Sequence, residues 1–358
     1  MRVVFLGLSI TSSWGNGHAT NYRALVRELA ARGHDVLFLE RDVPWYARQR
    51  DLPAPPWCET RLYDSVAQLR RTCAGDVRAA DLVVQGSYVP DGVAVADWML
   101  ATAQGVRAFY DIDTPVTLAK LERGDHEYLA PALIPRFDLY LSFTGGPTLR
   151  RLERRFGARR ARAFYCLVDP DAYAPAEVPL RWDLGYLGTY SDDRQPLIDA
   201  LLLEPARRLP RARFVVAGPQ YPEQIAWPAN VERRDHVAPA GHGAFYAAQR
   251  FTLNVTRADM RSAGWSPSVR LFEAAACGVP VISDRWDGLD RLFAEGEEIL
   301  IADGAADVQR MLEEISEQER RAVGDRARRR VLAEHSAQRR VDQLECEVAQ
   351  VRRTEAAA

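Results

Sequence analysis

The sequence lacks several features that would place it in a particular class of protein. Its five cysteines lie at positions 58, 73, 166, 277 and 346, and no two of them have the CxxC spacing of a zinc or redox site. No apolar run approaches the ~18 residues that a membrane-spanning helix needs. The net charge of −2 leaves no basic excess that would indicate nucleic acid as a partner. We therefore expect a cytoplasmic protein without a metal site, a disulfide framework or a transmembrane segment.

What the sequence does contain is a long alternation of helical and apolar segments. Its 358 residues suit two domains, and 47% apolar residues provide material for two cores. In the first half, helical patterns alternate with short apolar runs at residues 2–9, 35–40, 81–87, 107–113, 138–143 and 161–166. Such runs are typical of parallel strands buried on both faces. The first run is predicted to be a strand and not a signal peptide, because no basic segment precedes it.

A proline-containing segment separates this half from a second alternating series. Pro170, Pro175 and Pro179 predict a linker over residues 169–180. Beyond the linker, apolar runs recur at residues 183–188, 213–217, 231–237, 251–256 and 279–283. Two consecutive series of this kind indicate two parallel sheets.

The two series together predict the organisation of the chain. We expect an α/β protein with two Rossmann-like lobes, at residues 1–168 and 181–335, that face each other across a cleft. Ligands of such sheets bind at the carboxyl ends of the strands, so the cleft is where we expect the site. Residues 336–358 are predicted to form a C-terminal helix and tail that pack back on the first lobe.

The most informative motif lies at residues 265–284, which read WSPSVRLFEAAACGVPVISD. Ser266 followed by Pro267 predicts the start of a helix there, and Gly278 predicts its end. Ser266, Arg270 and Glu273 have i, i+4 and i+7 spacing and share one helix face. The free N–H groups of a helix start suit a diphosphate, Arg270 adds a cation, and Glu273 is placed to accept hydrogen bonds from ribose hydroxyls. The same spacing also fits a surface ion pair between Arg270 and Glu273.

A resemblance to a known family adds weight to the nucleotide interpretation. The stretch FEAAACGVPVISD resembles the donor-binding helix of GT-B glycosyltransferases, and WSPSVRLFEAAACG resembles more narrowly the CgeB-like, spore-maturation type. The resemblance implies the GT-B fold and a nucleotide diphosphate sugar as donor, with UDP- or TDP-sugars favoured and no cofactor or metal. It also implies that Glu273 holds the donor ribose, and we include Ser268 in the donor-binding set.

One position departs from the family pattern. Many retaining GT-B enzymes carry a second glutamate eight positions before the first, where this chain has Trp265. The departure leaves the stereochemistry of transfer and the grip on the donor sugar open.

A second candidate donor loop lies at residues 186–195, YLGTYSDDRQ. A glycine after a strand lets the backbone approach a phosphate, so Gly188, Thr189 and Tyr190 are candidate donor contacts. The resemblance implies that a basic residue shortly afterwards neutralises the leaving group, and Arg194 is our candidate. The alternative is an ordinary strand–helix turn with a solvated arginine.

Two further loops complete the predicted donor site. His236 and Val237 follow a strand, and the resemblance implies that their backbone groups read the nucleobase edge. Arg257, in the loop before Ser266, is a candidate second phosphate contact.

The first half offers candidates for contacts with the donor sugar and the acceptor. Gly15 and Gly17 in the loop TSSWGNGHAT permit unusual backbone angles near a ligand, and His18 is a candidate base or hydrogen-bond donor. Asp111 and Asp113 end a strand in FYDIDTP and suit a general base or an acceptor contact. The alternative for the aspartates is capping of the following helix, and for His18 an ordinary loop position.

These observations predict a glycosyltransferase that moves a sugar from a nucleotide diphosphate to an unknown acceptor. The predicted catalytic residues are Asp111, Asp113, His18 and Arg194. Two alternatives stay open: a sugar-nucleotide epimerase or hydrolase on the same fold, and a non-catalytic nucleotide-binding assembly protein. A nicotinamide-dependent oxidoreductase is disfavoured because GxG in the first loop lacks the third glycine of the dinucleotide fingerprint.

Overall fold

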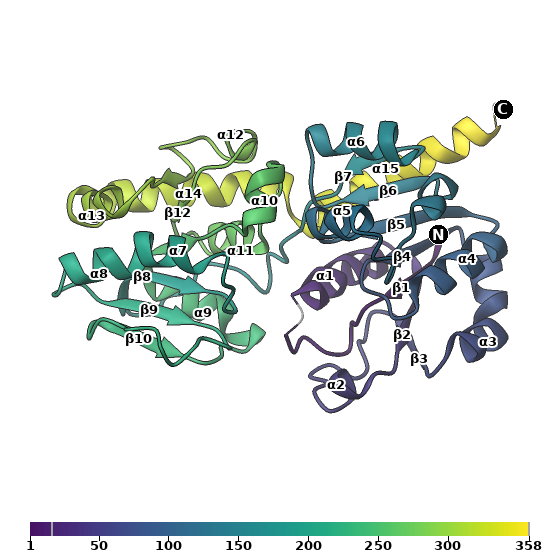
Figure 1. The fold of residues 1–358 in the computed structure, drawn as a ribbon, viewed down its shortest axis with the longest axis horizontal. Helices are drawn as coiled ribbons and strands as arrows, with labels where there is room; N and C mark the ends of the chain where they lie inside the picture. Colours follow the sequence, from purple (N-terminus) through teal and green to yellow (C-terminus); the bar gives the residue numbers. More distant parts are fainter. Residues whose placement is uncertain (16, 357–358) are drawn as a thin grey trace. The chain divides into compact units, whose positions relative to one another are not determined.

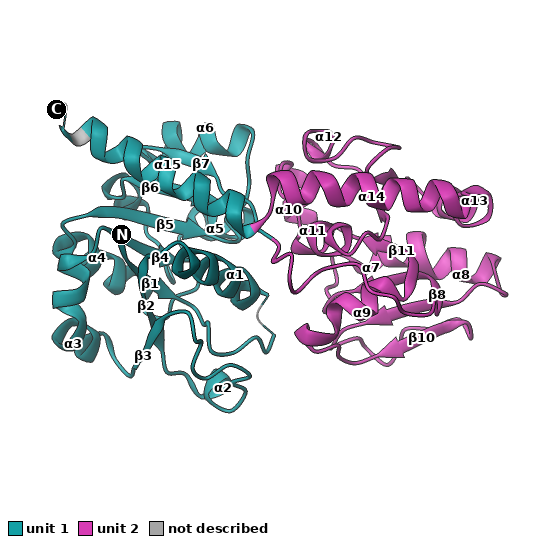
Figure 2. Ribbon diagram, turned by 180° about the vertical axis from the view of Figure 1, so that it is seen from behind, with its two compact units in different colours: residues 1–167, 337–358 teal, residues 168–336 magenta. Residues whose placement is uncertain are grey.

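The computed structural model describes residues 1–15 and 17–356, which form two compact units (Figure 2). Unit 1 comprises residues 1–167 together with residues 337–358, and unit 2 comprises residues 168–336. Each unit is built around one parallel β-sheet with helices packed on it (Figure 1). Within the described part of the chain, no helix is both long and apolar enough to span a lipid bilayer.

The sheet of unit 1 has seven strands in the order β3-β2-β1-β4-β5-β6-β7, all paired in parallel. The strands are β1 (Arg2–Gly7), β2 (Asp35–Arg41), β3 (Glu59–Tyr63), β4 (Leu82–Gly86), β5 (Val106–Asp111), β6 (Leu139–Ser142) and β7 (Ala161–Ala163). The inner strands are buried on both faces, which explains their continuous apolar runs. The prediction missed β3 because this edge strand, ETRLY, is mostly polar and exposed.

The helices of unit 1 connect these strands and cover the sheet. They are α1 (His18–Ala31), α2 (Pro44–Ala47), α3 (Val66–Ala79), α4 (Gly92–Thr102), α5 (Thr114–Glu122), η1 (Pro131–Arg136), α6 (Pro147–Phe156) and α15 (Ala337–Ala356). The last helix comes from the far end of the chain and packs beside α1. Arg32 binds Asp342 at 2.7 Å, and His34 contacts Glu345 at 2.7 Å.

The sheet of unit 2 has six parallel strands in the order β10-β9-β8-β11-β12-β13. The strands are β8 (Trp182–Leu187), β9 (Phe214–Ala217), β10 (Val231–Arg234), β11 (Gln249–Asn254), β12 (Val281–Ser283) and β13 (Leu300–Ile301). Its helices are α7 (Gln195–Ile198), η2 (Asp199–Leu203), α8 (Glu204–Arg208), η3 (Pro239–Gly241), α9 (His242–Ala247), α10 (Ala258–Ala263), α11 (Val269–Ala276), α12 (Leu289–Leu292), α13 (Ala305–Glu314) and α14 (Glu317–Glu334).

Both sheets repeat one topology. In each, the first strand of the unit is central, the next two strands extend to one side, and the later strands extend to the other. The strand order therefore reverses between β1 and β4 in unit 1, and between β8 and β11 in unit 2. Ligands of doubly wound sheets bind at the carboxyl ends of the strands beside this reversal. The topology therefore predicts that the functional site of each unit lies at this edge of its sheet.

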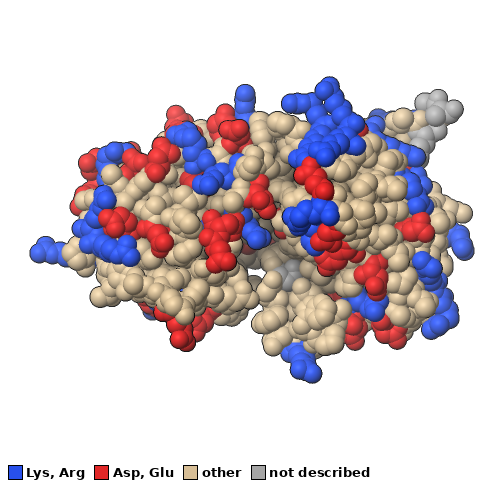
Figure 3. Space-filling model, in the orientation of Figure 1, with Lys and Arg blue, Asp and Glu red and all other residues tan. Residues whose placement is uncertain are grey.

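Charged side chains are mixed over most of the face drawn in Figure 3. The clearest exception is a group of arginines over α6, whose sequence is PTLRRLERRF. Arg151 and Arg155 of this helix pair with Glu122, so the group is partly neutralised.

Candidate functional site

The helix predicted to begin at Ser266 begins at Val269, with Ser268 in the capping position. The prediction of Ser266 as the helix cap is therefore wrong. A residue before proline is disfavoured in the helical conformation, so Pro267 delays the helix. The predicted end is confirmed, because Gly278 has φ +73° and the Val279 amide donates to the Ala274 carbonyl at 3.1 Å.

Arg270 joins the two strands at the reversal of the unit 2 sheet. Its Nε donates to the carbonyl of Leu187, the last residue of β8, at 2.6 Å. Its Nη1 donates to Oδ1 of Asn254, the last residue of β11, at 3.0 Å. The guanidinium carbon lies 4.6 Å from the centre of the Tyr186 ring, and the residue is only 6% exposed. Among the described residues Arg270 forms no ion pair with Glu273, so the helix-surface alternative does not apply.

A buried network around Asn254 holds this position. Ser268 Oγ donates to Asn254 Oδ1 at 2.7 Å, and Asn254 Nδ2 donates to Ser283 Oγ at 2.9 Å. Next to it, the amide and hydroxyl of Thr256 both donate to Asp284 Oδ1 at 3.0 Å. Burial raises the pKa of Asp284, against these hydrogen bonds. The network therefore fixes the carboxyl end of β11, where Asn254 accepts the hydrogen bond from Arg270.

The loop after β8 passes directly over Arg270. A Cβ added to Gly188 would lie 2.7 Å from Arg270 Nη2 and 2.6 Å from Tyr186 Oη, so only glycine fits without a shift. The next residues are partly exposed: the Thr189 carbonyl accepts a hydrogen bond from Arg194 Nη2 at 2.7 Å, and the Tyr190 hydroxyl donates to Asp192 at 2.5 Å. The loop thus presents backbone groups between two arginines.

Three guanidinium groups influence one another at this edge. Burial, with the nearby charges of Arg270 and Arg257, lowers the pKa of Arg194. The Nε atom of Arg194 is buried and has no hydrogen-bond partner in the part of the chain that the structure describes. Arg257 is 48% exposed and its nearest carboxylate, Asp193, lies 4.0 Å away. Asp193 offsets part of the charge of Arg194 and Arg257, and the remaining positive charge makes this edge of the sheet suited to an anion.

A fourth arginine, Arg233, was not predicted and supports the loops from behind. It donates to the carbonyls of Val216 and Gly218, and its guanidinium carbon lies 4.2 Å from the centre of the Tyr221 ring. Gly218 has φ +139°, and a Cβ there would come within 2.0 Å of the Gly188 carbonyl oxygen. The sequence feature that predicts the close approach of Gly218 to Gly188 is a glycine directly after β9, in the same position as Gly188 after β8.

Glu273 lies one turn after Arg270 and is buried among aromatic hydroxyls. Its Oε2 accepts a hydrogen bond from the Tyr246 hydroxyl at 3.1 Å.

The two residues predicted to face a nucleobase lie in the loop after β10, where His236 is exposed and Val237 is partly buried. The Val237 carbonyl contacts His242 Nε2 at 3.1 Å.

In unit 1, the two predicted aspartates lie at the end of β5 but differ in exposure. Asp111 is fully buried, and its oxygens accept from Thr117 at 2.7 Å and Tyr140 at 2.5 Å. Burial raises its pKa to about 6, against these hydrogen bonds. Asp113 precedes α5 without a side-chain capping bond and accepts from the Tyr88 hydroxyl at 2.8 Å. Asp113 is therefore the more available of the two carboxylates.

His18 approaches the same place from α1. Its ring centre lies 5.5 Å from that of Tyr88, a residue with φ +64° just after β4. Burial lowers the pKa of His18 to about 4, so the imidazole is neutral at pH 7. Tyr88 thus lies between the imidazole and the carboxylate of Asp113 at the strand reversal of unit 1.

The loop before α1 only partly follows the prediction. Gly15 has φ +59°, as expected, but Gly17 is helical at φ −63°, so the expectation of an unusual angle there is wrong. Glu40 is fully buried and accepts from the amides of Ile10 and Thr11 at 2.8 and 3.1 Å. Its carboxylate therefore fixes this loop. Residue 16 lies outside the described residues.

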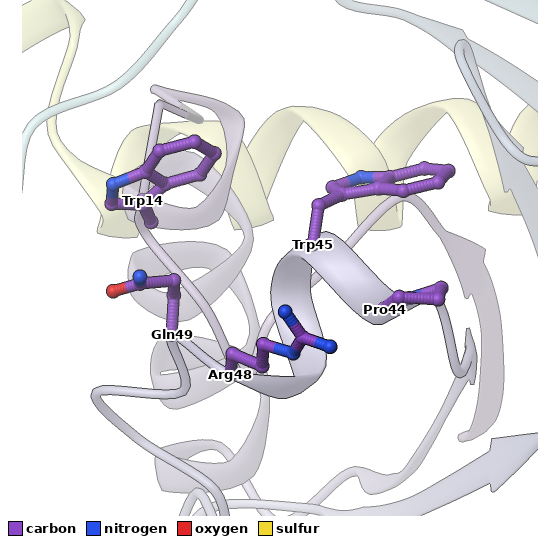
Figure 4. Close-up of a pocket in the computed structure, with 5 residues that line it drawn as sticks. All are labelled: Trp14, Pro44, Trp45, Arg48 and Gln49. Carbon is purple, nitrogen blue, oxygen red and sulfur yellow. The ribbon is translucent and has the colours of Figure 1, made fainter.

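Beside this loop is a hollow of about 350 Å³ lined by Trp14, Pro44, Trp45, Arg48 and Gln49 (Figure 4). Both tryptophans are 54% exposed. The two segments that carry them are tied together, since Ser12 Oγ donates to the Gln49 carbonyl at 2.7 Å and the Leu52 amide to the Thr11 carbonyl at 3.0 Å. The hollow is therefore a preformed surface.

No cluster of three or more His, Cys, Asp or Glu side chains with the geometry to hold a metal ion occurs in residues 1–15 and 17–356.

Comparison with known proteins identifies the fold. Residues 194–345 match the model of a family described as glycosyl transferase-like, and no curated sequence matches the chain. Sucrose-phosphate synthase from Thermosynechococcus elongatus has 17% identity and a TM-score of 0.68. HepE from Anabaena, solved with UDP and glucose, has 14% identity and a TM-score of 0.69. Both comparisons cover 100% of this chain and 100% of the other.

A third similar structure is an α-glucosyltransferase solved with UDP-glucose and DNA containing an abasic site. It has 13% identity and a TM-score of 0.68, over 97% of this chain and 99% of its own. The structural similarities confirm the predicted GT-B fold. The match over residues 194–345 confirms the predicted class of enzyme, a glycosyltransferase.

Proposed function

We propose that this protein transfers a sugar from a nucleoside diphosphate, UDP or TDP, held by unit 2 to an acceptor held by unit 1. The observation that carries the proposal is the group of Arg194, Arg257 and Arg270 at the carboxyl edge of the unit 2 sheet. As the bond from the sugar to the diphosphate breaks, negative charge grows on the leaving phosphate. Preplaced guanidinium groups stabilise that charge.

The proposed role of these cations makes the reaction independent of a metal. The guanidiniums of Arg194, Arg257 and Arg270, with the backbone N–H groups of the Gly188 loop, supply the positive charge that Mg²⁺ supplies in other enzymes. Ser268 and the start of α11 add backbone amide groups to the same anion. Retained transfer in the presence of excess chelator is the expected result, and loss of transfer that Mg²⁺ restores would contradict it.

We propose the remaining donor contacts on the basis of the resemblance to GT-B glycosyltransferases. Glu273 accepts from the ribose hydroxyls, and the backbone of His236 and Val237 faces the nucleobase. HepE and the α-glucosyltransferase were solved with UDP or UDP-glucose, which supports a UDP-sugar. The residues 265–277 further support placement in the CgeB-like type.

On the acceptor side, we assign Asp113 as the group that accepts the proton of the attacking hydroxyl. His18, neutral and close to Tyr88, positions this carboxylate through the tyrosine hydroxyl. Asp111 supports the arrangement from the buried side, since its Oδ1 accepts from the Asp113 amide at 3.3 Å. Because Trp14 and Trp45 present exposed indole faces beside Arg48, we place a sugar ring of the acceptor on the hollow they line.

Calorimetry with UDP, TDP and GDP, followed by product analysis with the corresponding sugars, tests the function. We expect one diphosphate to bind and its sugar to be transferred. Binding should be weakened in Arg257→Gln but unchanged in Arg329→Gln, a matched change at an exposed arginine on α14. Conversion of the sugar nucleotide to an epimer without an acceptor, or binding without any turnover, would overturn the proposal.

A further inference from the structure

We infer that the hollow at Trp14 and Trp45 selects an acceptor saccharide that carries a negative charge, either a carboxylate or a phosphate. This assignment rests on the proposed function, in which a sugar ring of the acceptor lies on the hollow, and it adds the chemical class of that sugar. Three features of unit 1 support it: two exposed indoles, a fixed backbone beneath them, and an arginine without a charge partner.

The first feature is the exposure of the two indole rings. Of the eight tryptophans in the sequence, Trp14 and Trp45 alone are exposed, each at 54%, and the other six are partly or fully buried. The two come from different segments, the loop after β1 and helix α2, yet they line one hollow (Figure 4). Large apolar surfaces that gather in one place indicate a binding site, and the C–H face of a sugar ring packs on an indole face.

The second feature is the fixed backbone under these rings. The Ser13 amide donates to Asp51 Oδ1 at 2.8 Å, which ties the segment that carries Trp14 to the chain beyond α2. Within α2, Tyr46 is only 7% exposed and anchors the helix to unit 1. Trp45 and Arg48 are three residues apart and therefore lie on one side of this helical turn, where both are exposed. The hollow keeps its shape without a ligand.

The third feature is the unpaired charge of Arg48. Other arginines of this region are paired with aspartates, in the pairs Arg23–Asp51 and Arg50–Asp42. Arg48 forms neither a hydrogen bond nor an ion pair within residues 1–15 and 17–356. Because the two nearby aspartates already hold other arginines, a ligand is what supplies a negative charge to Arg48.

The hollow therefore has a contact for each part of a charged sugar. Figure 4 draws the guanidinium of Arg48 between Gln49 and Pro44, below the Trp45 ring, and all of them line the hollow. The planar N–H groups of a guanidinium match two oxygens of a carboxylate or a phosphate. The Gln49 amide both donates to and accepts from hydroxyls. The indoles bind the ring, Arg48 binds the acid group, and Gln49 binds a hydroxyl.

Calorimetry with four small probes tests the selectivity. The charged sugars are methyl glucuronide and glucose 6-phosphate, the neutral sugar is methyl glucoside, and benzoate is a charged molecule that is not a sugar. We expect at least one charged sugar to bind about fivefold more tightly than the neutral sugar, the effect of a favourable ion pair at a partly exposed site. The charged sugar with the larger preference identifies the acid group as carboxylate or phosphate.

Three results with these probes would overturn the inference. They are equal affinities for charged and neutral sugars, no binding of any sugar at millimolar concentrations, and binding of benzoate as tight as that of the charged sugars.

Variants locate the effect in the hollow. Arg48→Gln should reduce the affinity for the charged sugars to that for methyl glucoside and leave the latter unchanged, whereas Trp45→Ala should weaken binding of all three sugars. Arg150→Gln is the matched control, at an exposed arginine of α6 that has no partner in the described part of the chain. A preference for charged sugars that survives Arg48→Gln, or that Arg150→Gln also removes, would contradict the role of Arg48.

Failure of this inference and failure of the proposed function give different results. If UDP, TDP and GDP do not bind while charged sugars still bind in a manner that depends on Arg48, the proposed function is overturned and the selectivity of the hollow is retained. If a nucleotide binds and its sugar is transferred, but charged and neutral sugars bind equally, this inference alone is overturned.

Discussion

The two units share a strand order but present different chemistry at the corresponding edge. In unit 2, Arg194 and Arg270 donate to backbone carbonyls or a side-chain amide and form no ion pair within the described residues. In unit 1, the arginines around the carboxyl ends of β1 and β2 are neutralised by aspartates, in the pairs Arg23–Asp51, Arg41–Asp91 and Arg50–Asp42. Hydroxyls and carboxylates occupy the strand reversal instead. Topology decides where a ligand binds, and side-chain pairing decides which ligand.

The largest expected effect comes from removing the central cation of unit 2. Arg270→Gln should weaken nucleoside diphosphate binding at least 100-fold, because a charge-assisted contact is lost in a buried setting. Arg50→Gln, at the matching edge of unit 1, should leave the affinity unchanged because its charge is already paired with Asp42. Calorimetry with UDP measures both. Equal losses in the two variants would remove the distinction between the edges.

The next effect concerns the carboxylate of unit 1. Asp113→Asn should lower turnover about 100-fold, the usual contribution of a general base, while UDP affinity stays the same. Release of the nucleoside diphosphate in the presence of an acceptor measures the rate. A variant that loses nucleotide binding, or one that keeps full turnover, would contradict the assignment of proton transfer to unit 1.

A smaller effect on nucleotide affinity should distinguish Gly188 from Gly17, two loop glycines that have the same predicted role of approaching a ligand. Gly188→Ala places a methyl group against Arg270 and Tyr186, so nucleotide affinity should fall about tenfold as the guanidinium is displaced. A Cβ on Gly17 meets nothing within 4 Å and its backbone is helical, so Gly17→Ala should change neither affinity nor stability measurably. Titration of both variants with UDP checks the contrast.

The smallest expected effect is on the pH dependence of the free energy of unfolding. The pKa of Asp111 is raised to about 6 in the folded chain, so its protonation favours folding as the pH falls through 6. His18, with its pKa lowered to about 4, acts in the opposite direction below pH 6.5. The variant Asp111→Asn removes the contribution of Asp111 and retains that of His18, so its comparison with the unmodified protein isolates the effect of Asp111. The stability advantage of the unmodified protein over this variant should grow by about 1 kcal/mol from pH 7 to pH 5 in chemical denaturation. A constant difference would contradict the buried carboxylate.

Much of the fold was predictable because it depends on local patterns. Apolar runs of strand length and prolines between them gave two parallel sheets, and Gly278 marked the end of α11. The start of α11 was mistaken because two local rules compete at Ser266, where the preference of serine for capping is opposed by the following proline. The missed edge strand β3 has no apolar run to recognise.

The candidate site was predictable only where its residues lie on one helix. Arg270 and Glu273 share a sequence motif, but their partners Asn254, Leu187 and Tyr246 come from other strands and helices. No spacing along the chain announces such contacts. Asp111 and Asp113 look equivalent in the sequence motif, but the fold buries Asp111 and leaves Asp113 more available.

The final helix, α15, has a consequence for how the molecule is made. It is synthesised after the whole of unit 2, yet it supplies Asp342, Glu347 and Arg352, the partners of Arg32, Arg162 and Asp81 in unit 1. Unit 2 has its whole sequence before then, although it comes second in the chain. Unit 1, which includes residues 1–167, therefore becomes complete only after unit 2 has been synthesised.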